Sequence, residues 1–380
     1  MACQGCLSLS LFKKSMAIEK IKLNEFLAHA VRLPLFDVRS PAEYKQAHIP
    51  GAFSLPLFND EERKIVGTAY KQQSREMAIK IGLDIFGPKM RKMVEEVEQI
   101  INKEFTPIPN SGNKATVLVH CWRGGMRSAG VAWLLDLYGF KVYTLTGGYK
   151  AFRQWVMAQF EIEYPLNIIG GYTGSGKTLL LKELTKRGQV TVDLEGIARH
   201  KGSAFGDDDA TPQPRQEMFE NELAMALKNS VEKLQAPNTI GIAKPIWLED
   251  ESQRVGQLNI PNALWRTMRA APVYFIDVPF EERLDYITKD YGSQEKTKLV
   301  NATMRIQKRL GGNDTKMAVN YLLEDNYKEA FRILLSYYDK HYKKSLENRE
   351  NLIELLHNIP CGKINTPANT QKILNEKILE

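Results

Sequence analysis

The chain has 380 residues, of which 43% are apolar and 26% charged, the balance of an ordinary globular protein long enough for two domains. Its net charge of +7 suits a polyanionic partner without requiring one. Four cysteines are too few for a disulfide framework, and no stretch is apolar enough to span a membrane, so we expect a cytoplasmic protein with no membrane partner. Residues 1–17 read as a disordered or extraneous leader, in which Cys3 and Cys6 lack a second pair of metal ligands.

The first half of the chain alternates short apolar runs with helical patterns. Ser40, Pro41 and Glu43 have the spacing of a capped helix start directly after one apolar run. Strands that alternate with helices predict a parallel sheet with both faces covered. The predicted elements are strands at 35–39, 53–57, 117–119 and 141–145, a polar helical insertion at about 59–110, and helices after Ser40, Ser128 and Gly148.

A cysteine ends the strand at 117–119 and is followed by two glycines and a helix. Backbone N–H groups in such a loop converge on an anion, and the helix N-terminus adds partial positive charge. Arg123 and Arg127 add full charges, so we expect the Cys121 thiol to be drawn towards the thiolate. We therefore predict that Cys121 is a nucleophile or a chalcogen carrier, in an anion-binding loop made of Trp122, Arg123, Gly124, Gly125, Met126, Arg127 and Ser128.

The second half opens with an apolar run at 166–169, and the residues that follow fit the G-x4-G-K-T pattern of a phosphate-binding P-loop without a mismatch. The helix after it is expected to stop at Gly188. Glycines let backbone N–H groups close around phosphates, Lys177 reaches the outer phosphate, and the Thr178 hydroxyl can hold Mg²⁺. We predict a phosphate-binding site made of Gly171, Tyr172, Thr173, Gly174, Ser175, Gly176, Lys177 and Thr178.

Two further apolar runs in this half, at 190–193 and 246–249, end in acidic residues. Carboxylates at the carboxyl ends of parallel strands lie near bound phosphates and their metal ions. The predicted acidic, metal-side residues are Asp193, Glu249 and Asp250.

The chain closes with helical patterns in which aromatic residues alternate with lysines. Such residues can stack on bases and contact phosphates, although a half-solvated amphipathic helix would look the same. The predicted nucleic-acid-binding residues are Lys340, Tyr342, Lys343 and Lys344, with Arg305, Lys308 and Arg309 as the alternative.

Asp37-x-Arg39, Glu43-Tyr44, the run His48 to Ala52 and the strand that ends in Cys121 resemble a rhodanese domain over about residues 20–160. Rhodanese domains carry sulfur or selenium on a cysteine. The common rhodanese loop has four residues between cysteine and arginine, whereas five separate Cys121 from Arg127, as in cysteine-dependent phosphatases. The wider loop suggests a tetrahedral donor of the size of phosphate.

The fusion of such a domain to a P-loop resembles the bacterial tRNA 2-selenouridine synthase family. The resemblance is carried by the cysteine loop and by motifs at 59–63, 66–68, 200–203, 247–252 and 309–312. It implies a two-domain α/β protein, with a rhodanese-like domain at 18–162 and a P-loop domain with extra C-terminal helices at 163–380.

In that family, the sulfur of wobble 2-thiouridine in tRNA is geranylated from geranyl diphosphate and then replaced by selenium from selenophosphate. The resemblance thus implies Cys121 for selenium and residues 171–178 for the diphosphate. The implied partners are a tRNA carrying wobble 2-thiouridine and an enzyme that supplies selenophosphate. Mg²⁺ is the metal ion that the P-loop can use.

Three other functions stay open from the residues alone. An ATP-dependent tRNA sulfurtransferase would use the same cysteine and consume nucleotide at the P-loop. A cysteine-dependent phosphatase fused to a kinase-like domain fits the loop spacing, but it requires a general-acid aspartate that the sequence does not single out. A non-enzymatic RNA-binding module would leave Cys121 and Lys177 without a purpose, and this makes it the least favoured of the three.

Overall fold

The structure is a computed structural model that describes residues 18–105, 115–201, 212–235, 245–292 and 294–378. The expected leader with Cys3 and Cys6, the end of the expected insertion at 106–110, and part of the 200–203 motif lie outside the described residues. The chain divides into two compact units, Met1–Val156 and Met157–Glu380, so the division falls inside the last helix of the first unit.

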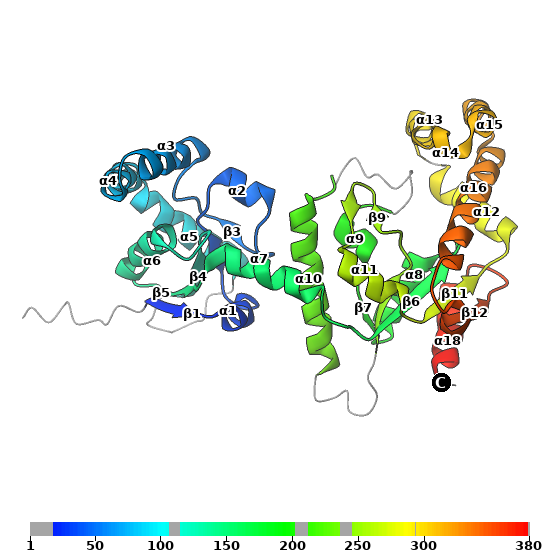
Figure 1. The fold of residues 1–380 in the computed structure, drawn as a ribbon, viewed down its shortest axis with the longest axis horizontal. Coiled ribbons are helices and arrows are strands. Elements are labelled where there is room, and N and C mark those ends of the chain that lie inside the picture. Colours follow the sequence, from blue (N-terminus) through cyan, green and yellow to red (C-terminus); the bar gives the residue numbers. More distant parts are fainter. Residues whose placement is uncertain (1–17, 106–114, 202–211, 236–244, 293, 379–380) are drawn as a thin grey trace, which may run out of the picture. The chain divides into compact units, whose positions relative to one another are not determined.

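The first unit is a five-stranded parallel sheet with helices between the strands (Figure 1). The strand order is β1-β5-β4-β2-β3, so the two strands that end at Asp37 and His120 are neighbours. The elements are β1 Ile18–Ile21, α1 Leu23–Ala30, β2 Leu35–Asp37, α2 Pro41–Gln46, β3 Phe53–Ser54, α3 Asp60–Gln72, α4 Arg75–Phe86, a 3₁₀ turn at Gly87–Lys89, α5 Met90–Glu104, β4 Thr116–His120, α6 Met126–Tyr138, β5 Lys141–Leu145 and α7 Gly148–Gln159.

Alternation along the buried strands sends side chains to two apolar layers. On one face, Val117 and Val119 pack in a cluster with residues of α5 and α6. On the other face, His120 lies against Phe26 of α1 and Tyr149 of α7. Helices therefore cover both faces, as the sequence predicts.

The segment between β3 and β4 is helical, and its first helix begins at a capping box. Asn59 accepts a hydrogen bond from the backbone of Glu62, whose side chain accepts one from the backbone of Asn59, both at 2.8 Å. These bonds satisfy two N–H groups that the first turn leaves without a helical partner. The described part of the insertion thus consists of α3, α4, the 3₁₀ turn and α5.

The second unit also has a five-stranded parallel sheet, in the order β12-β11-β6-β8-β7, and a short antiparallel hairpin. The P-loop follows β6, the central strand. The elements are β6 Leu166–Gly171, α8 Lys177–Lys186, β7 Val190–Thr191, α9 Leu194–Ala198, α10 Gln216–Leu234, β8 Ile246–Glu249, β9 Arg254–Val255, β10 Leu258–Asn259, α11 Asn262–Arg269, β11 Val273–Asp277, α12 Phe280–Tyr291, α13 Lys296–Arg305, α14 Gln307–Leu310, α15 Gly312–Leu323, α16 Tyr327–Glu347, α17 Leu352–Leu355, β12 Leu356–Pro360 and α18 Thr366–Ile378.

Two apolar clusters hold this unit together. One joins the sheet to α8 and α18 and contains Trp247, Tyr274 and Ile373. The other joins helices α12 to α16, which are drawn in yellow to orange in Figure 1. The predicted α/β class with extra C-terminal helices is confirmed, and no helix of the described residues is long and apolar enough to cross a membrane.

Four strands of the described residues are absent from the predictions: the edge strands β1 and β12 of the two parallel sheets, and the hairpin strands β9 and β10. β1 and β12 each border one sheet, and most of their side chains are at least partly exposed. An edge strand needs no continuous apolar run, so the pattern that marks the central strands is missing here. β3 is shorter than expected and ends at Ser54 instead of Leu57.

Candidate functional site

Cys121 lies at the carboxyl end of β4 and is almost completely buried. Its Sγ atom is 3.2 Å from the hydroxyl oxygen of Ser128, in the first turn of α6. The same hydroxyl is 3.1 Å from the carbonyl oxygen of Gly125. The loop between strand and helix thus folds back on the sulfur.

The start of α7 is hydrogen-bonded to this loop. Tyr149 and Lys150 donate backbone hydrogen bonds to the carbonyl oxygens of Cys121 and Trp122, at 2.8 and 2.9 Å. A Cβ atom at Gly148 would lie 2.4 Å from the Cys121 carbonyl oxygen, and this residue has a φ of +60°. Glycine is therefore required at this point, both for its backbone conformation and for the close approach.

The loop favours the ionised form of Cys121. Burial alone would raise the pKa of the thiol, but hydrogen bonds from the Ser128 side chain and from backbone N–H groups of Ser128, Arg123 and Gly125 lower it. The direction agrees with the expectation from the sequence. The backbone N–H groups contribute as expected, whereas the charges of Arg123 and Arg127, which were also expected to contribute, are not among the main causes. Arg123 is exposed, and Arg127 is bound to a carboxylate instead.

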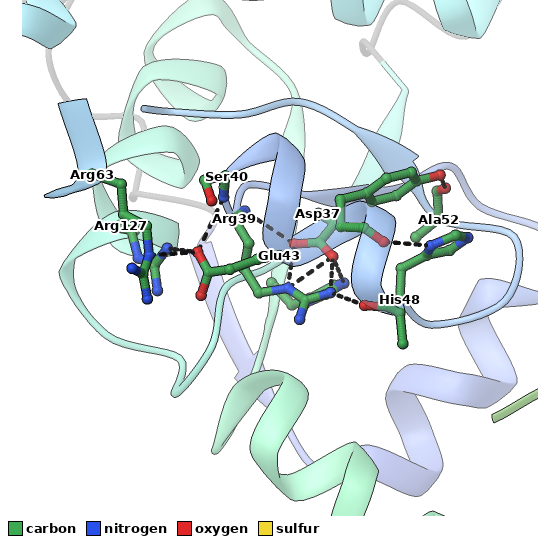
Figure 2. Close-up of polar contacts among 11 residues, drawn as sticks. Asp37, Arg39, Ser40, Glu43, His48, Ala52, Arg63 and Arg127 are labelled. Atoms are coloured by element: carbon green, nitrogen blue, oxygen red, sulfur yellow. Dashed lines mark hydrogen bonds and ion pairs between the residues drawn. The ribbon is translucent and has the colours of Figure 1, made fainter. Parts of the chain in front are cut away.

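Buried charges support the neighbouring strand end. Asp37 and Arg39 form an ion pair whose shortest contact is 2.6 Å, with both side chains almost fully buried (Figure 2). The Arg39 guanidinium also donates to the carbonyl oxygen of Ala47 at 2.7 Å and lies 3.8 Å from the centre of the Tyr149 ring. Burial lowers the pKa of His120, which is the residue before Cys121. The Asp-x-Arg motif therefore holds the loop in place from within the core.

In the second unit, the predicted P-loop joins β6 to α8. Gly174 and Gly176 have φ values of +80° and +83°, which let the chain turn tightly before the helix. The ammonium group of Lys177 donates to the carbonyl oxygen of Gly171 at 2.9 Å, so it is held beside the loop. Among the described residues, the Ser175 hydroxyl is buried without a hydrogen-bond partner. A phosphate bound in the loop would give it one.

Three glutamates gather beside Lys177 and Thr178. Carboxylate oxygens of Glu195, Glu249 and Glu251 all lie within 4.8 Å of one another. The Thr178 hydroxyl is 3.1 Å from Glu195 and 3.3 Å from Glu249. Burial, with the charge of Glu195 second, raises the pKa of Glu249 to about 8. Burial also raises the pKa values of Glu195 and Glu251.

This cluster fits the Mg²⁺ ion that a P-loop implies. One oxygen of Glu249 is buried without a hydrogen-bond partner among the described residues, which is costly unless a ligand meets it. Carboxylate and hydroxyl oxygens are the donors that Mg²⁺ prefers. A divalent cation would also relieve the repulsion that brings the pKa values up.

Two family models cover most of the chain. Residues 22–154 match the model of the rhodanese-like domain, and residues 164–359 match the model described as the tRNA 2-selenouridine synthase AAA domain. The chain belongs to the tRNA 2-selenouridine synthase family. The resemblance from its motifs is thereby confirmed, and both predicted domain types are present.

Curated relatives match over nearly the full length. The tRNA 2-selenouridine synthase of Sulfurovum sp. is 35% identical over 353 residues, which are 84% of this chain and 90% of the relative. The enzyme of the same name from Hydrogenovibrio crunogenus is 32% identical over 363 residues, or 87% and 94% of the two chains. The similarity therefore includes both units of this family member.

The three predicted acids do not act as one group in this synthase-family chain. Glu249 belongs to the cluster, whereas the Asp193 side chain caps α9 by accepting a hydrogen bond from the Gly196 backbone at 2.7 Å. Asp250 is paired with Arg349 and with Tyr342. Neighbours along an extended chain point to opposite sides, which separates Asp250 from Glu249 at the end of β8. Glu195 and Glu251, which follow the same two predicted strands, complete the cluster with Glu249.

The predicted tRNA-binding residues on α16 separate into two groups. Lys340, Lys343 and Lys344 are exposed, so their contact with RNA stays a prediction. Tyr342 faces the other way: its hydroxyl donates to Asp250 at 2.6 Å and accepts from the Gly171 backbone N–H at 3.1 Å. The Tyr342 hydroxyl therefore supports the P-loop, and stacking of its ring on a base stays a prediction.

A second contact also ties α16 to the P-loop. The Arg283 guanidinium makes two hydrogen bonds to Asp339, at 2.9 and 2.7 Å, and one to the Thr173 carbonyl oxygen at 3.1 Å. Asp339 and Tyr342 are three residues apart, so they lie on one face of the helix. Sequence patterns carry no signal for these contacts, because they join residues far apart in the chain.

Proposed function

We propose that this chain replaces the sulfur of wobble 2-thiouridine in tRNA by selenium, through an S-geranyl intermediate. The supporting observation is the pairing, in one chain of this family, of a P-loop with a cysteine loop that favours the thiolate. The relatives are named tRNA 2-selenouridine synthases, and this name gives the substrate class. The two loops divide the reaction into two half-reactions.

Geranyl transfer is assigned to the P-loop. The bond between the geranyl carbon and the diphosphate oxygen breaks, the carbon bonds to the thiocarbonyl sulfur, and the N3 proton of the base is released. Negative charge grows on the leaving diphosphate. Backbone N–H groups of residues 171–178 and the Lys177 ammonium stabilise that charge where it develops.

Mg²⁺ would be held by Thr178, Glu195, Glu249 and Glu251. When bound, it supplies further positive charge to the departing diphosphate. Without the ion, these carboxylates repel one another. The Thr178 hydroxyl lies within hydrogen-bond distance of two of them, Glu195 and Glu249.

The selenium step is assigned to the cysteine loop. Alkylation turns the thiocarbonyl sulfur into a thioether, which can leave the base carbon as geranylthiol. Selenophosphate is a phosphate-sized anion, and the N–H groups that point at Cys121 suit its capture. In the net exchange, the base carbon gains a bond to selenium and loses geranylthiol, and water releases phosphate from the donor.

Mass spectrometry of wobble uridines tests this function. We expect tRNA from cells that contain the protein to carry 2-selenouridine, and tRNA from cells without it to carry 2-thiouridine only. An ATP-dependent sulfurtransferase would instead add sulfur to uridine and consume nucleotide. Selenouridine that persists in cells without the protein would contradict the proposal.

A further inference from the structure

The arginine of the cysteine loop is held by a carboxylate that a second arginine shares. One oxygen of Glu43 accepts a hydrogen bond from Arg127 at 2.8 Å, one from Arg63 at 3.1 Å, and one from the Ser40 backbone at 3.2 Å (Figure 2). Arg63 comes from α3, the first helix of the insertion. An arginine of the insertion and an arginine of the cysteine loop therefore bind the same carboxylate, that of Glu43.

The topology places this group beside Cys121. β2 and β4 are neighbouring parallel strands, so the loops after them lie at the same edge of the sheet. Glu43 belongs to α2, which follows β2, and Arg127 directly precedes Ser128, whose hydroxyl contacts the Cys121 sulfur. The Arg127–Glu43 bond therefore bridges the two loops, and Arg63 joins it from outside.

The carboxylate at the centre of this group is ionised. Burial opposes ionisation of Glu43, but the hydrogen bond and charge of Arg127 hold its pKa below the ordinary value, so the acid is charged at neutral pH. Both guanidinium groups share this carboxylate, and the charge of Arg63 also interacts with that of Asp60. In the contacts of the described residues, each guanidinium donates one N–H to Glu43, and its other N–H groups are left for a second anion.

Helix α3, which carries Arg63, is anchored to α2 at its first turn. The Asp60 carboxylate, at the start of α3, accepts a hydrogen bond from the Ala42 backbone at 3.0 Å. The side chains of Arg63 and Arg127 are 51% and 24% exposed, so an anion from solvent can reach them. Phosphate-type anions favour such a pair, because arginine donors match their oxygens in two-point contacts.

We propose that Arg63 and Arg127 together form the oxygen-binding half of the donor site, with Glu43 as the positioning residue that holds both. The ligand class is a doubly charged tetrahedral anion of the phosphate type. Assigning that anion as selenophosphate rests on the proposed function, but the binding site itself does not. A residue of the helical insertion thereby becomes part of the cysteine-loop site.

Protection of Cys121 from alkylation by iodoacetamide measures this site, with inorganic phosphate as the probe and the full chain without tRNA. We expect phosphate to slow alkylation of the Cys121 peptide in a saturable way. Arg63→Gln should weaken the protection constant about tenfold, the effect of one charge-assisted hydrogen bond. Arg63→Lys keeps the charge but loses the two-point geometry of the guanidinium. Its protection constant should lie between those of the unaltered protein and Arg63→Gln.

Lys64→Gln is the matched control, because it removes the same charge from the neighbouring exposed position of α3. It should leave the protection constant within about twofold. Equal effects of Arg63→Gln and Lys64→Gln would overturn the proposal and leave only general electrostatic attraction. Absence of protection in the unaltered protein, or an unchanged constant in Arg63→Gln, would also overturn it. Geranyl transfer should be normal in both variants, so a failure here is distinct from a failure of the proposed function.

Discussion

The two loops of this chain treat charge in opposite ways. The cysteine loop surrounds a sulfur with donors: Ser128 and backbone N–H groups point at Cys121, and the flanking residues are arginines. The P-loop places a lysine beside three glutamates, of which one keeps an oxygen without a hydrogen-bond partner among the described residues. In the first site, the hydrogen-bond donors are already in place around the sulfur before an anion binds. In the proposed function, a phosphate and a cation would occupy the second site together.

The largest effect should come from the one cation of the P-loop motif. Lys177→Ala removes the principal countercharge of the proposed diphosphate and should reduce geranyl transfer about a hundred- to a thousandfold, as the loss of one transition-state donor does. tRNA that is already geranylated should still be selenated by this variant, because that step uses the other loop. Assays with each of the two tRNAs measure the steps separately. Normal geranylation by Lys177→Ala would assign the P-loop to another ligand, such as a nucleotide.

A smaller effect is expected from the phenol that supports the P-loop. Tyr342→Phe keeps the ring near Lys177 but leaves the Gly171 N–H and an Asp250 oxygen without their partner. Such a loss costs about 1–3 kcal/mol. We expect KM for geranyl diphosphate to rise about tenfold, together with a lower free energy of unfolding.

Tyr337→Phe is the control for this change, since it removes the same group five residues earlier on α16. It should leave KM unaltered. If both variants behave alike, the Tyr342 hydroxyl has no special part in diphosphate binding.

The hydrogen bond from Ser128 should set the pH at which Cys121 reacts. The pKa of this thiol is lowered, so alkylation should reach half its maximum rate below the pH of an ordinary cysteine. Ser128→Ala removes a bond that favours the thiolate, and the profile should move to higher pH. At neutral pH, we expect alkylation to slow about tenfold. Cys361, which is buried in the second unit, is an internal control whose profile should not move. If Ser128→Ala leaves the pH profile of Cys121 alkylation unchanged, the lowered pKa must come from the backbone donors alone.

The weakest effect is expected from the exposed lysines of α16. Replacing Lys340, Lys343 and Lys344 with glutamine should flatten the salt dependence of tRNA binding by roughly two units, at about 0.7 to 0.9 for each phosphate contact. Affinity for geranyl diphosphate should not change. Glutamines at Lys64, Lys71 and Lys80 remove the same charge from exposed positions of the first unit and should have a smaller effect on the slope. An unchanged slope in the α16 variant would move the RNA site, with Arg305, Lys308 and Arg309 as the next group to test.

Short motifs made much of this protein predictable. The cysteine loop and the P-loop each follow a strand and precede a helix, so a few adjacent residues determine both their chemistry and their place at the sheet edge. The central strands carry continuous apolar runs and were equally visible. The predicted strand that leads into Asp37-x-Arg39 and the predicted helix that begins after Ser40 are both confirmed for the same reason.

Contacts between distant residues were beyond reach. Arg127 meets an acid 84 positions earlier, and Gly171 meets a tyrosine 171 positions later. Nothing local distinguishes Glu195 and Glu251 from the neighbouring acids Asp193 and Asp250. Only the pairing of strands and the docking of α16 decide which carboxylates face the P-loop.

The division of labour between the two loops is tested most directly by the tRNA of cells that carry Cys121→Ala. Mass spectrometry of wobble uridines should find no 2-selenouridine and an accumulation of geranylated 2-thiouridine, because the P-loop still works while the selenium step is lost. Cys361→Ala is the matched control and should give the pattern of the unaltered protein. Normal selenouridine in Cys121→Ala would contradict the account and remove this cysteine from the mechanism.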